Sequence, residues 1–372
     1  MTKHLALALV ACAAFAVSPA LAQTVPDWQK KWDDIVAGAK KEGKVVVIAP
    51  PDTKVRQALP AAFKAKYGVT VEYLGGRSSE SAAKMRAERA AGVSTVDVAL
   101  SGVDTMANIF YREKMLDPID DTVLVLPEVT EGKYWKAGKP WFMDPDGKYV
   151  LRLFNTVTRM FFINTAMVKP EEIKTSKDLL DPKWKGKIIV HDPTVPGNGS
   201  NDAARLYAQL GEDFLKKFYV DQQPRIVRDR RQITDGISRG SYPIALGAED
   251  EDVNAFIKEG VPLRSIYELE DLPGSLSAGV GEAALIANAP HPNAARLFIN
   301  WIASREGLEL YCRVRGGAPT RNDIDEASFL PPETIPKPGV EYFDSFGWEF
   351  TVTTKEKVRE RMVDLLKDAK GK

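Results

Sequence analysis

The sequence predicts an α/β protein with two lobes, each built on a mostly parallel sheet flanked by helices. Short apolar runs alternate with amphipathic stretches from residue 28 to residue 100, and the alternation starts again near Ile188. Strands that alternate with helices are typical of parallel sheets. The chain has 372 residues, more than one hydrophobic core usually supports, so two separate cores are expected.

The first lobe begins with three strand and helix repeats. Lys44–Ala49 is almost wholly apolar, which is typical of a strand buried on both faces. In such sheets, ligands collect in the loops beyond the carboxyl ends of the strands. We expect helices at 28–39, 59–67 and 79–91, strands at 44–49, 69–74 and 97–100, and ligand-facing loops at 50–53, 75–79 and 101–104.

The same pattern predicts a second lobe. Residues 148–164 alternate apolar and polar side chains, which indicates a strand pair that leaves the first lobe. A fresh strand, a polar loop and a helix then follow. We expect strands at 188–191, 226–228, 242–246, 262–267 and 278–286, helices at 202–210 and 233–239, and a docked helix in the lysine-rich tail at 355–372.

A long helix is predicted near the end of the second half. Two prolines forbid a helix before Asn293, whose side chain is expected to cap the helix that follows. Apolar residues recur at three- and four-residue spacing from Ala295 to Tyr311, which predicts one buried helical face. Gly316 and Gly317 are expected to end the helix after Arg313.

Two phrases carry a family resemblance. Residues 178–188 read Asp-Leu-Leu-Asp-Pro-Lys-Trp-Lys-Gly-Lys-Ile, and residues 315–322 read Arg-Gly-Gly-Ala-Pro-Thr-Arg-Asn. Together with the preceding helix, they resemble the extracellular solute-binding proteins that feed ABC importers, in their ferric-iron-binding branch. The resemblance implies a type II periplasmic binding protein fold with hinge strands near 155–161 and 272–280, and an ABC permease of the inner membrane as partner. It implies a first lobe at 23–155 plus 273–318 and a second lobe at 156–272 plus 319–372.

The N-terminus predicts export to the periplasm. Lys3 precedes the apolar run Leu5–Val17, whose 13 residues are too few to span a bilayer, and residues 20–22 form an Ala-x-Ala cleavage site. We therefore expect a cleavable signal peptide at 1–22. An alternative takes Leu9–Cys12 as a lipoprotein cleavage box, although the apolar run continues past Cys12.

Composition excludes several classes of function. Basic and acidic residues number 51 each, so nothing indicates a nucleic acid partner. After loss of the signal peptide only Cys312 remains, which excludes an internal disulfide and a cysteine-ligated metal site. The sequence lacks the serine elbow, the His-Glu-x-x-His run and a Cys-His pair, so we expect no enzyme activity and no cofactor, and a monomer. A secreted enzyme on the same scaffold stays open as an alternative.

Polar residues in the expected loops are the candidate ligand contacts. Arg77 offers a planar fork of donors suited to carboxylate, phosphate or sulfonate, beside two glycines and two serines that can cap a helix. Arg159 lies beside the first crossover and could reach the cleft or form a surface salt bridge. Each loop could equally be an ordinary capped turn. The candidates are Asp52, Thr53, Gly76, Arg77, Ser78, Ser79, Ser101, Gly102, Arg159, Asn198, Gly199, Ser200, Asn201 and Asp250.

Four acids at 249–252 follow an expected strand and allow a rival function. The iron branch that the chain resembles would carry adjacent tyrosines there, and the sequence contains no Tyr-Tyr pair, which argues against Fe(III) bound by phenolates. A carrier of a divalent metal would use Asp250, Asp252 and His191. These acids could also hold a ligand amine, or complement a helix dipole in solvent, which is the reading we favour.

The sequence thus predicts a periplasmic receptor whose lobes close over a small polar solute. Arg77 and the helix ends favour an anionic or zwitterionic solute.

Overall fold

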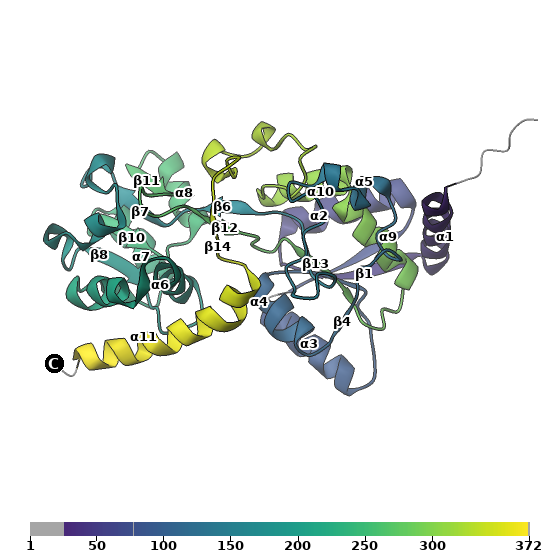
Figure 1. The fold of residues 1–372 in the computed structure, drawn as a ribbon, viewed down its shortest axis with the longest axis horizontal. Coiled ribbons are helices and arrows are strands. Elements are labelled where there is room, and N and C mark those ends of the chain that lie inside the picture. The colour runs from purple at the N-terminus through teal and green to yellow at the C-terminus, as the bar shows by residue number, and fades with distance from the viewer. Residues whose placement is uncertain (1–25, 77, 371–372) are drawn as a thin grey trace, which may run out of the picture.

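The structure, a computed structural model, describes residues 26–76 and 78–370. The chain forms two lobes that lie end to end along the long axis of the molecule (Figure 1). Each lobe has its own sheet, which confirms the expected two-lobed α/β fold. The α-helices are α1 (Asp27–Glu42), α2 (Thr53–Tyr67), α3 (Ser78–Ala90), α4 (Val103–Thr105), α5 (Pro127–Thr130), α6 (Asn198–Lys216), α7 (Arg230–Ser238), α8 (Asp250–Lys258), α9 (Pro292–Ala303), α10 (Arg305–Arg315) and α11 (Lys355–Lys370).

The sheet of the first lobe has the order β2-β1-β3-β13-β4, and β5 also pairs with β13. Strands β1, β2 and β3 are parallel, whereas β13 is antiparallel to its neighbours. In β1, Val45 and Val47 face a core shared with α2, α9 and α10, whereas Val46 and Ile48 face a second cluster with α3. Helices on both faces explain why this strand is apolar throughout. The strands are β1 (Lys44–Ala49), β2 (Thr70–Gly75), β3 (Val98–Ser101), β4 (Leu116–Asp117), β5 (Leu151–Arg152) and β13 (Glu282–Ile286).

The sheet of the second lobe has the order β11-β7-β10-β8-β9. Ile188 and Val190 of β8 face a core with α6 and α11, and Ile189 faces a smaller core with α7 and α8. The second lobe therefore repeats the layered plan of the first. The strands are β7 (Phe161–Asn164), β8 (Ile188–His191), β9 (Arg225–Val227), β10 (Ile244–Leu246) and β11 (Leu263–Ile266).

A small third sheet, β14-β12-β6, joins the lobes. β6 (Thr156–Thr158) and β12 (Ser275–Ser277) pair antiparallel and lie within the two segments expected to form the hinge. β14 (Phe343–Asp344) pairs in parallel with β12. The chain therefore crosses between the lobes a third time at β14, whereas the sequence analysis expected this crossing at residue 319.

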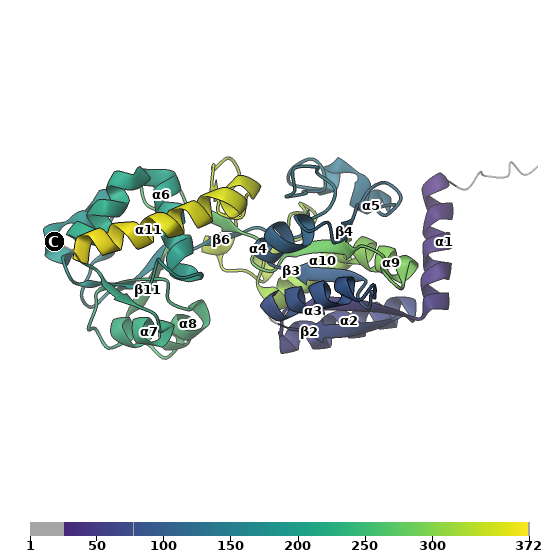
Figure 2. The same cartoon turned by 90° about the horizontal axis from the view of Figure 1, so that it is seen from below.

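Residues 343–355, which we call the C-terminal crossover, contact both lobes. Phe346, Trp348 and Val352 pack against the first lobe, whereas Phe350 lies in the core of the second. Arg152 of β5 holds this segment, because its Nη1 lies 2.9 Å from Asp344 Oδ2 and its Nη2 donates to the carbonyl oxygen of Phe346 at 2.7 Å. α11 then runs along the second lobe (Figures 1 and 2), which confirms the docked tail helix.

The long helix expected after Asn293 is two helices. α9 ends at Ala303 because Ser304 is extended, and the Ser304 side chain accepts a hydrogen bond from the Gly307 amide at 3.3 Å and so caps α10. The expectation that Asn293 caps this helix was wrong. Glu42 of α1 accepts from the amides at 293 and 294 instead, at 3.2 and 2.7 Å.

The chain leaves the first lobe later than the expected boundary at residue 319. Arg321 is fully buried and donates to the carbonyl oxygen of Glu128 at 2.6 Å, and Ile324 belongs to the main core of the first lobe. The crossing comes at β14 instead.

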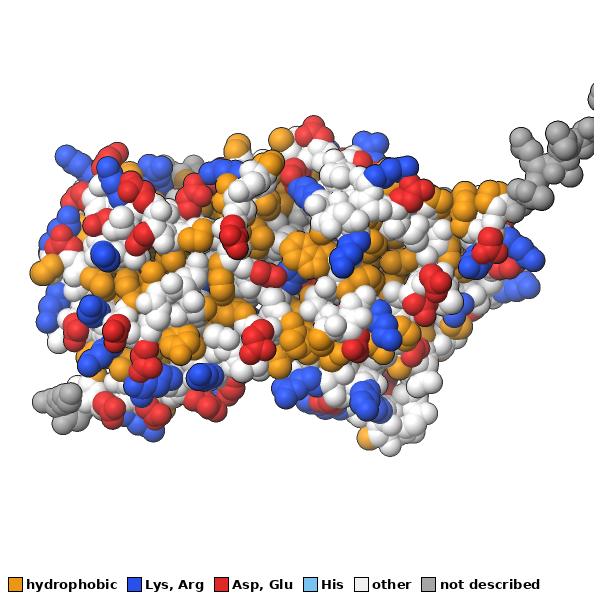
Figure 3. Space-filling view, viewed as in Figure 1, with side chains coloured by type: hydrophobic (Ala, Val, Ile, Leu, Met, Phe, Trp, Pro, Cys, Tyr) orange, Lys and Arg blue, Asp and Glu red, His pale blue; other side chains and the backbone are white. Residues whose placement is uncertain are grey.

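The surface carries charges of both signs. On the face shown in Figure 3, basic and acidic side chains are interspersed over both lobes, with no broad area of one sign. Across the described residues, none of the helices combines the length and the apolar character needed to cross a bilayer.

Candidate functional site

Two neighbouring cavities lie at the junction of the lobes. The first, of about 310 Å³, is lined by the second lobe, by Ser277 of β12 and by the C-terminal crossover. The second, of about 530 Å³, lies between first-lobe residues around Asp104 and Arg112 and the start of α6. Asn201 and Lys355 line both cavities, so the two adjoin in one cleft.

The start of α6 is packed tightly against the end of β8. Gly197 has φ +138°, a conformation that glycine tolerates, and the Gly199 amide donates to Nδ1 of His191 at 2.9 Å. A Cβ atom at Gly199 would lie only 2.3 Å from the carbonyl oxygen of His191. The helix therefore starts at Asn198 rather than at the expected residue 202, and its first turn faces the cavities.

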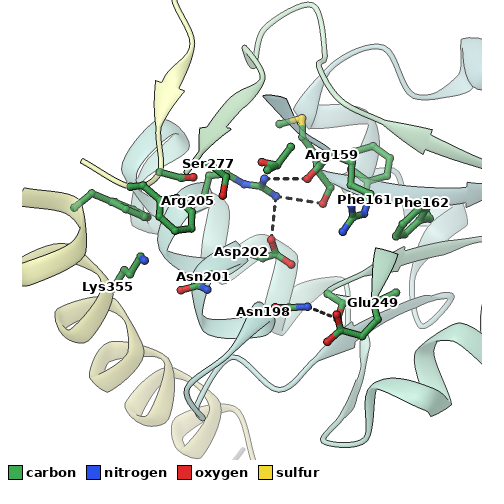
Figure 4. A pocket seen from close by; sticks show the side chains of 17 residues that line it. Arg159, Phe161, Phe162, Asn198, Asn201, Asp202, Arg205, Glu249, Ser277 and Lys355 are labelled. Carbon is green, nitrogen blue, oxygen red and sulfur yellow. Dashed lines mark hydrogen bonds and ion pairs between the residues drawn. The ribbon is translucent and has the colours of Figure 1, made fainter. Parts of the chain in front are cut away.

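The second turn of α6 places a buried ion pair in the wall of the first cavity (Figure 4). Arg205 Nη2 lies 3.0 Å from Asp202 Oδ1, and the same guanidinium donates to the carbonyl oxygens of Arg159 and Met160, both at 3.2 Å. Arg205 thus ties α6 to the segment that leads from β6 to β7. Burial raises the pKa of Asp202, and the charges of Arg205 and Arg159 counteract this rise.

Arg159 is a half-buried cation of the same cavity. Its guanidinium carbon lies 4.7 Å from the centre of the Phe162 ring. Burial lowers the pKa of Arg159 to about 10, although the charge of Asp202 opposes the change. The side chain is therefore still protonated at neutral pH, in a site with little water to screen its charge.

Lys355 approaches from the C-terminal crossover. Its Nζ lies 3.2 Å from Asp104 Oδ1 on the first lobe and 4.9 Å from the centre of the Phe346 ring, and its side chain is 11% exposed. It thus links the first lobe to the crossover at the edge of both cavities.

The first cavity contains both signs of charge, with positive charge in excess. Arg159, Arg205 and Lys355 line it together with Asp202 and Glu249, and Glu249 pairs with Arg230 outside the lining. No tyrosine occurs among the described lining residues of either cavity, and no group of three or more His, Cys, Asp or Glu suited to a metal occurs among the described residues. His191 uses Nδ1 as an acceptor, and burial lowers its pKa.

The second-lobe candidates from the sequence gather at this cleft. Arg159, Asn198 and Asn201 line the first cavity, and Ser200 lines the second. Gly199 is buried, and its amide donates a hydrogen bond to Nδ1 of His191.

The first-lobe candidates that the structure describes line neither cavity. Asp52 caps α2 by accepting from the amides of Lys54 and Val55 at 2.8 and 3.0 Å, and it pairs with Arg315 at 2.5 Å. Burial acts to raise the pKa of Asp52, but these partners outweigh it and lower the pKa. Thr53 is the exposed first residue of α2.

The other first-lobe candidates lie at the same edge of the sheet. The Gly76 amide donates to the carbonyl oxygen of Ala49 at 3.1 Å. Ser101 ends β3 and is buried, and a Cβ atom at Gly102 would lie 3.2 Å from the carbonyl oxygen of Gly279. The structure does not describe Arg77, nor the side chains of Ser78, Ser79 and Asp250.

Sequence reasoning missed Asp202, Arg205 and Lys355. The first two form an acid and base pair three residues apart, a pattern typical of a solvated helix face. Lys355 reaches the cleft because the chain crosses at β14, whereas the sequence analysis expected this crossing at residue 319.

Comparisons with known proteins show the family and the fold of the chain. The sequence model of the family described as "Bacterial extracellular solute-binding protein" matches residues 58–337. Iron uptake protein A1 of Synechocystis sp. is 31% identical over 159 residues, which are 42% of this chain and 40% of that protein. A Haemophilus influenzae protein is 23% identical over 287 residues, which are 74% of this chain and 77% of that protein.

Solved structures share the fold at low sequence identity. The Trichodesmium FutA structure, in complex with iron and citrate, has a TM-score of 0.63 at 19% identity and covers 88% of this chain and 99% of its own. AfuA from Actinobacillus pleuropneumoniae, with fructose-6-phosphate bound, has a TM-score of 0.59 at 18% identity and the same coverage. The Mannheimia haemolytica ferric iron-binding protein A, in an open conformation, has a TM-score of 0.64 at 16% identity, again with this coverage.

Proposed function

Because the chain belongs to the bacterial extracellular solute-binding proteins, we propose that it captures a small acid-bearing solute in the cleft between its lobes and delivers it to an ABC permease. The observation that carries this proposal is Arg159, a half-buried cation in a cavity at the lobe junction. A permanent cation in a partly enclosed cavity attracts an anionic group more strongly than one in bulk water does.

The surroundings of Arg159 support an acid group as the anchor. The first turn of α6 faces the cavity, and no described residue accepts a hydrogen bond from the amides of Asn198 and Ser200. Amides at a helix start carry partial positive charge and bind carboxylate or phosphate oxygens. Lys355 and the exposed Arg112 add positive charge at the edge.

Closure of the lobes would complete the site. The second cavity is lined by both lobes, so a solute that reaches it gains contacts as the lobes approach. Such a solute binds the closed state better and shifts the population toward it. The three strands β6, β12 and β14 are the hinge in this account, and the protein acts as a monomer outside the cytoplasm. The signal peptide expected at 1–22 lies outside the described residues.

The relatives are described with different solutes, so the solute class has to come from the lining. FutA was solved with iron and citrate and AfuA with fructose-6-phosphate. The described lining offers Arg, Lys and amide donors, which suit oxygen-rich organic acids better than a bare metal ion.

A ligand panel with Arg159→Gln tests the proposal. Thermal shift and then calorimetry would compare carboxylates, phosphates, phosphonates, sulfonates, neutral sugars, ferric citrate, Ca²⁺ and Zn²⁺. We expect an acid-bearing solute to bind, and the variant to bind it at least about tenfold more weakly, because a charge-assisted hydrogen bond contributes about 1.5 to 3 kcal/mol.

The matched control is Arg264→Gln, which removes an exposed arginine of β11 outside the cavities and should leave affinity unchanged. Equal affinity of wild type and Arg159→Gln, or binding of metal ions or neutral sugars alone, would refute the proposal. Arg77→Ala belongs in the same series and is expected to weaken binding by tens of fold.

A further inference from the structure

The cavity lined by Arg159 is also lined by the carboxylate of Asp202, and one oxygen of this carboxylate has no hydrogen-bond donor among the described residues. Asp202 Oδ1 accepts from Arg205 at 3.0 Å, but no described residue donates a hydrogen bond to Oδ2. The side chain is 17% exposed and lines the first cavity. Figure 4 shows Asp202 joined to Arg205 on one side and open toward Asn198 and Glu249 on the other.

The structural role of Asp202 uses only one of its two carboxylate oxygens. Arg205 satisfies Oδ1 and also holds the carbonyl oxygens of Arg159 and Met160, so the brace is complete without Oδ2. A largely buried charge is costly unless hydrogen bonds satisfy it. The remaining oxygen therefore suits a cationic donor that enters from the cavity.

We propose that the solute carries an ammonium group as well as its acid group, and that Asp202 Oδ2 receives the ammonium while Arg159 receives the acid. This inference rests on the function proposed above and names the class of its solute. The cavity of about 310 Å³ equals the volume of about ten water molecules, which fits a solute of about ten non-hydrogen atoms. Thr158, Ser277, Asn198 and Asn201 line the same cavity and offer hydroxyl and amide groups to the rest of the solute.

The lining explains why an ammonium is preferred to a divalent metal at this position. Arg205 and Arg159 already place two positive charges near Asp202, and a second carboxylate, Glu249, is paired with Arg230. Ca²⁺ and Mg²⁺ need six or more oxygen ligands and Zn²⁺ usually needs four ligands, whereas an ammonium needs three acceptors. Asp202 Oδ2 and the side-chain oxygens of Asn198 and Asn201 are acceptors of the first cavity.

Matched pairs of acids with and without an amine test the inference. Calorimetry in EDTA-containing buffer would compare β-alanine with propanoate, phosphoethanolamine with ethyl phosphate, and taurine with ethanesulfonate. We expect the amine to raise affinity at least about tenfold in the pair whose acid group fits. Equal affinities within every pair that binds would overturn the inference, while the function proposed above would stand.

Asp202→Asn then assigns the effect to this side chain. Asparagine keeps the oxygen that accepts from Arg205, so the brace is preserved, but it loses the negative charge. We expect the variant to lose the advantage of the amine and to bind the amine-free acid as well as wild type does, or more tightly. Asp213→Asn, an exposed acid in α6 beyond its break at Gly211, is the matched control and should keep the advantage.

The outcomes separate the two proposals. An amine preference that survives Asp202→Asn overturns the role of Asp202, and binding that requires added Ca²⁺ or Zn²⁺ overturns the ammonium assignment. If no acid binds in any form, the function proposed above fails as well. If the variant does not fold, as judged by its thermal melt, the matched pairs with wild type decide the solute class.

Discussion

Glu282 is an ionisable side chain enclosed where the first lobe meets the crossover strands. It is fully buried, and its Oε1 lies 3.1 Å from Arg152 Nε. Burial raises the pKa of Glu282 to about 7 even though Arg152 favours the ionised form. Its charge therefore changes near neutral pH, beside the arginine that holds Asp344 of the crossover.

Glu282→Gln tests this titration through stability. The unfolded chain releases this proton near the ordinary value of 4.5, and the folded protein near 7, so the folded state binds more protons between these values. The free energy of unfolding of wild type should then fall, relative to that of the variant, by up to about 3 kcal/mol as pH rises through this window. Denaturant unfolding at pH 4.5, 6 and 7.5 measures it. Parallel pH profiles of the two proteins would contradict the prediction.

Single residues differ in how far the sequence predicts them. Arg159 was a candidate because it lies beside the first crossover, with a surface salt bridge as the equal alternative, and it does line the first cavity. Asp202 and Arg205 were missed because the helix was expected to start at residue 202. The structure starts it four residues earlier, because Gly197 and Gly199 pack closely on His191, and this places Asp202 and Arg205 in the second turn. That packing depends on two segments meeting in space, and spacing along one helix does not reveal it.

At the scale of elements, the start of α9 is capped by a side chain from another helix, α1. Glu42 lies in the last turn of α1, where a negative charge is unfavourable for its own helix. Its carboxylate instead accepts from the amides of Asn293 and Ala294 at the start of α9. The sequence predicted the α9 start from its prolines but assigned the cap to the local Asn293, because the true partner lies 251 residues away in the chain.

Glu42→Ala measures this cap between helices. The substitution leaves two amides at the start of α9 without their acceptor, and we expect the free energy of unfolding to fall by about 1 to 3 kcal/mol. Lys41→Ala, at an exposed position of the same helix, is the matched control and should change stability by less than about 0.5 kcal/mol. Denaturant unfolding followed by tryptophan fluorescence compares the three proteins. Equal losses in both variants would show that Glu42 does not act as the cap.

At the scale of the whole molecule, the sequence predicted the two lobes, because each lobe repeats its own strand and helix alternation. The strands β6 and β12 lie within the two segments expected to form the hinge. The sequence analysis expected the third crossing at residue 319 rather than at β14, a strand of two residues whose pairing partner β12 lies in a distant segment of the chain. The C-terminal crossover packs on both lobes and supplies Lys355 to the cleft. The proposed hinge therefore includes a segment that also lines the proposed site.

The most direct test of the account is small-angle X-ray scattering of the wild-type protein with and without the acid-bearing solute identified by calorimetry. The account predicts that the radius of gyration falls when the solute saturates the protein, because the lobes close over it. Arg159→Gln at the same solute concentration should keep the larger radius. An unchanged radius of gyration at saturation would contradict the claim that this cleft closes on its solute.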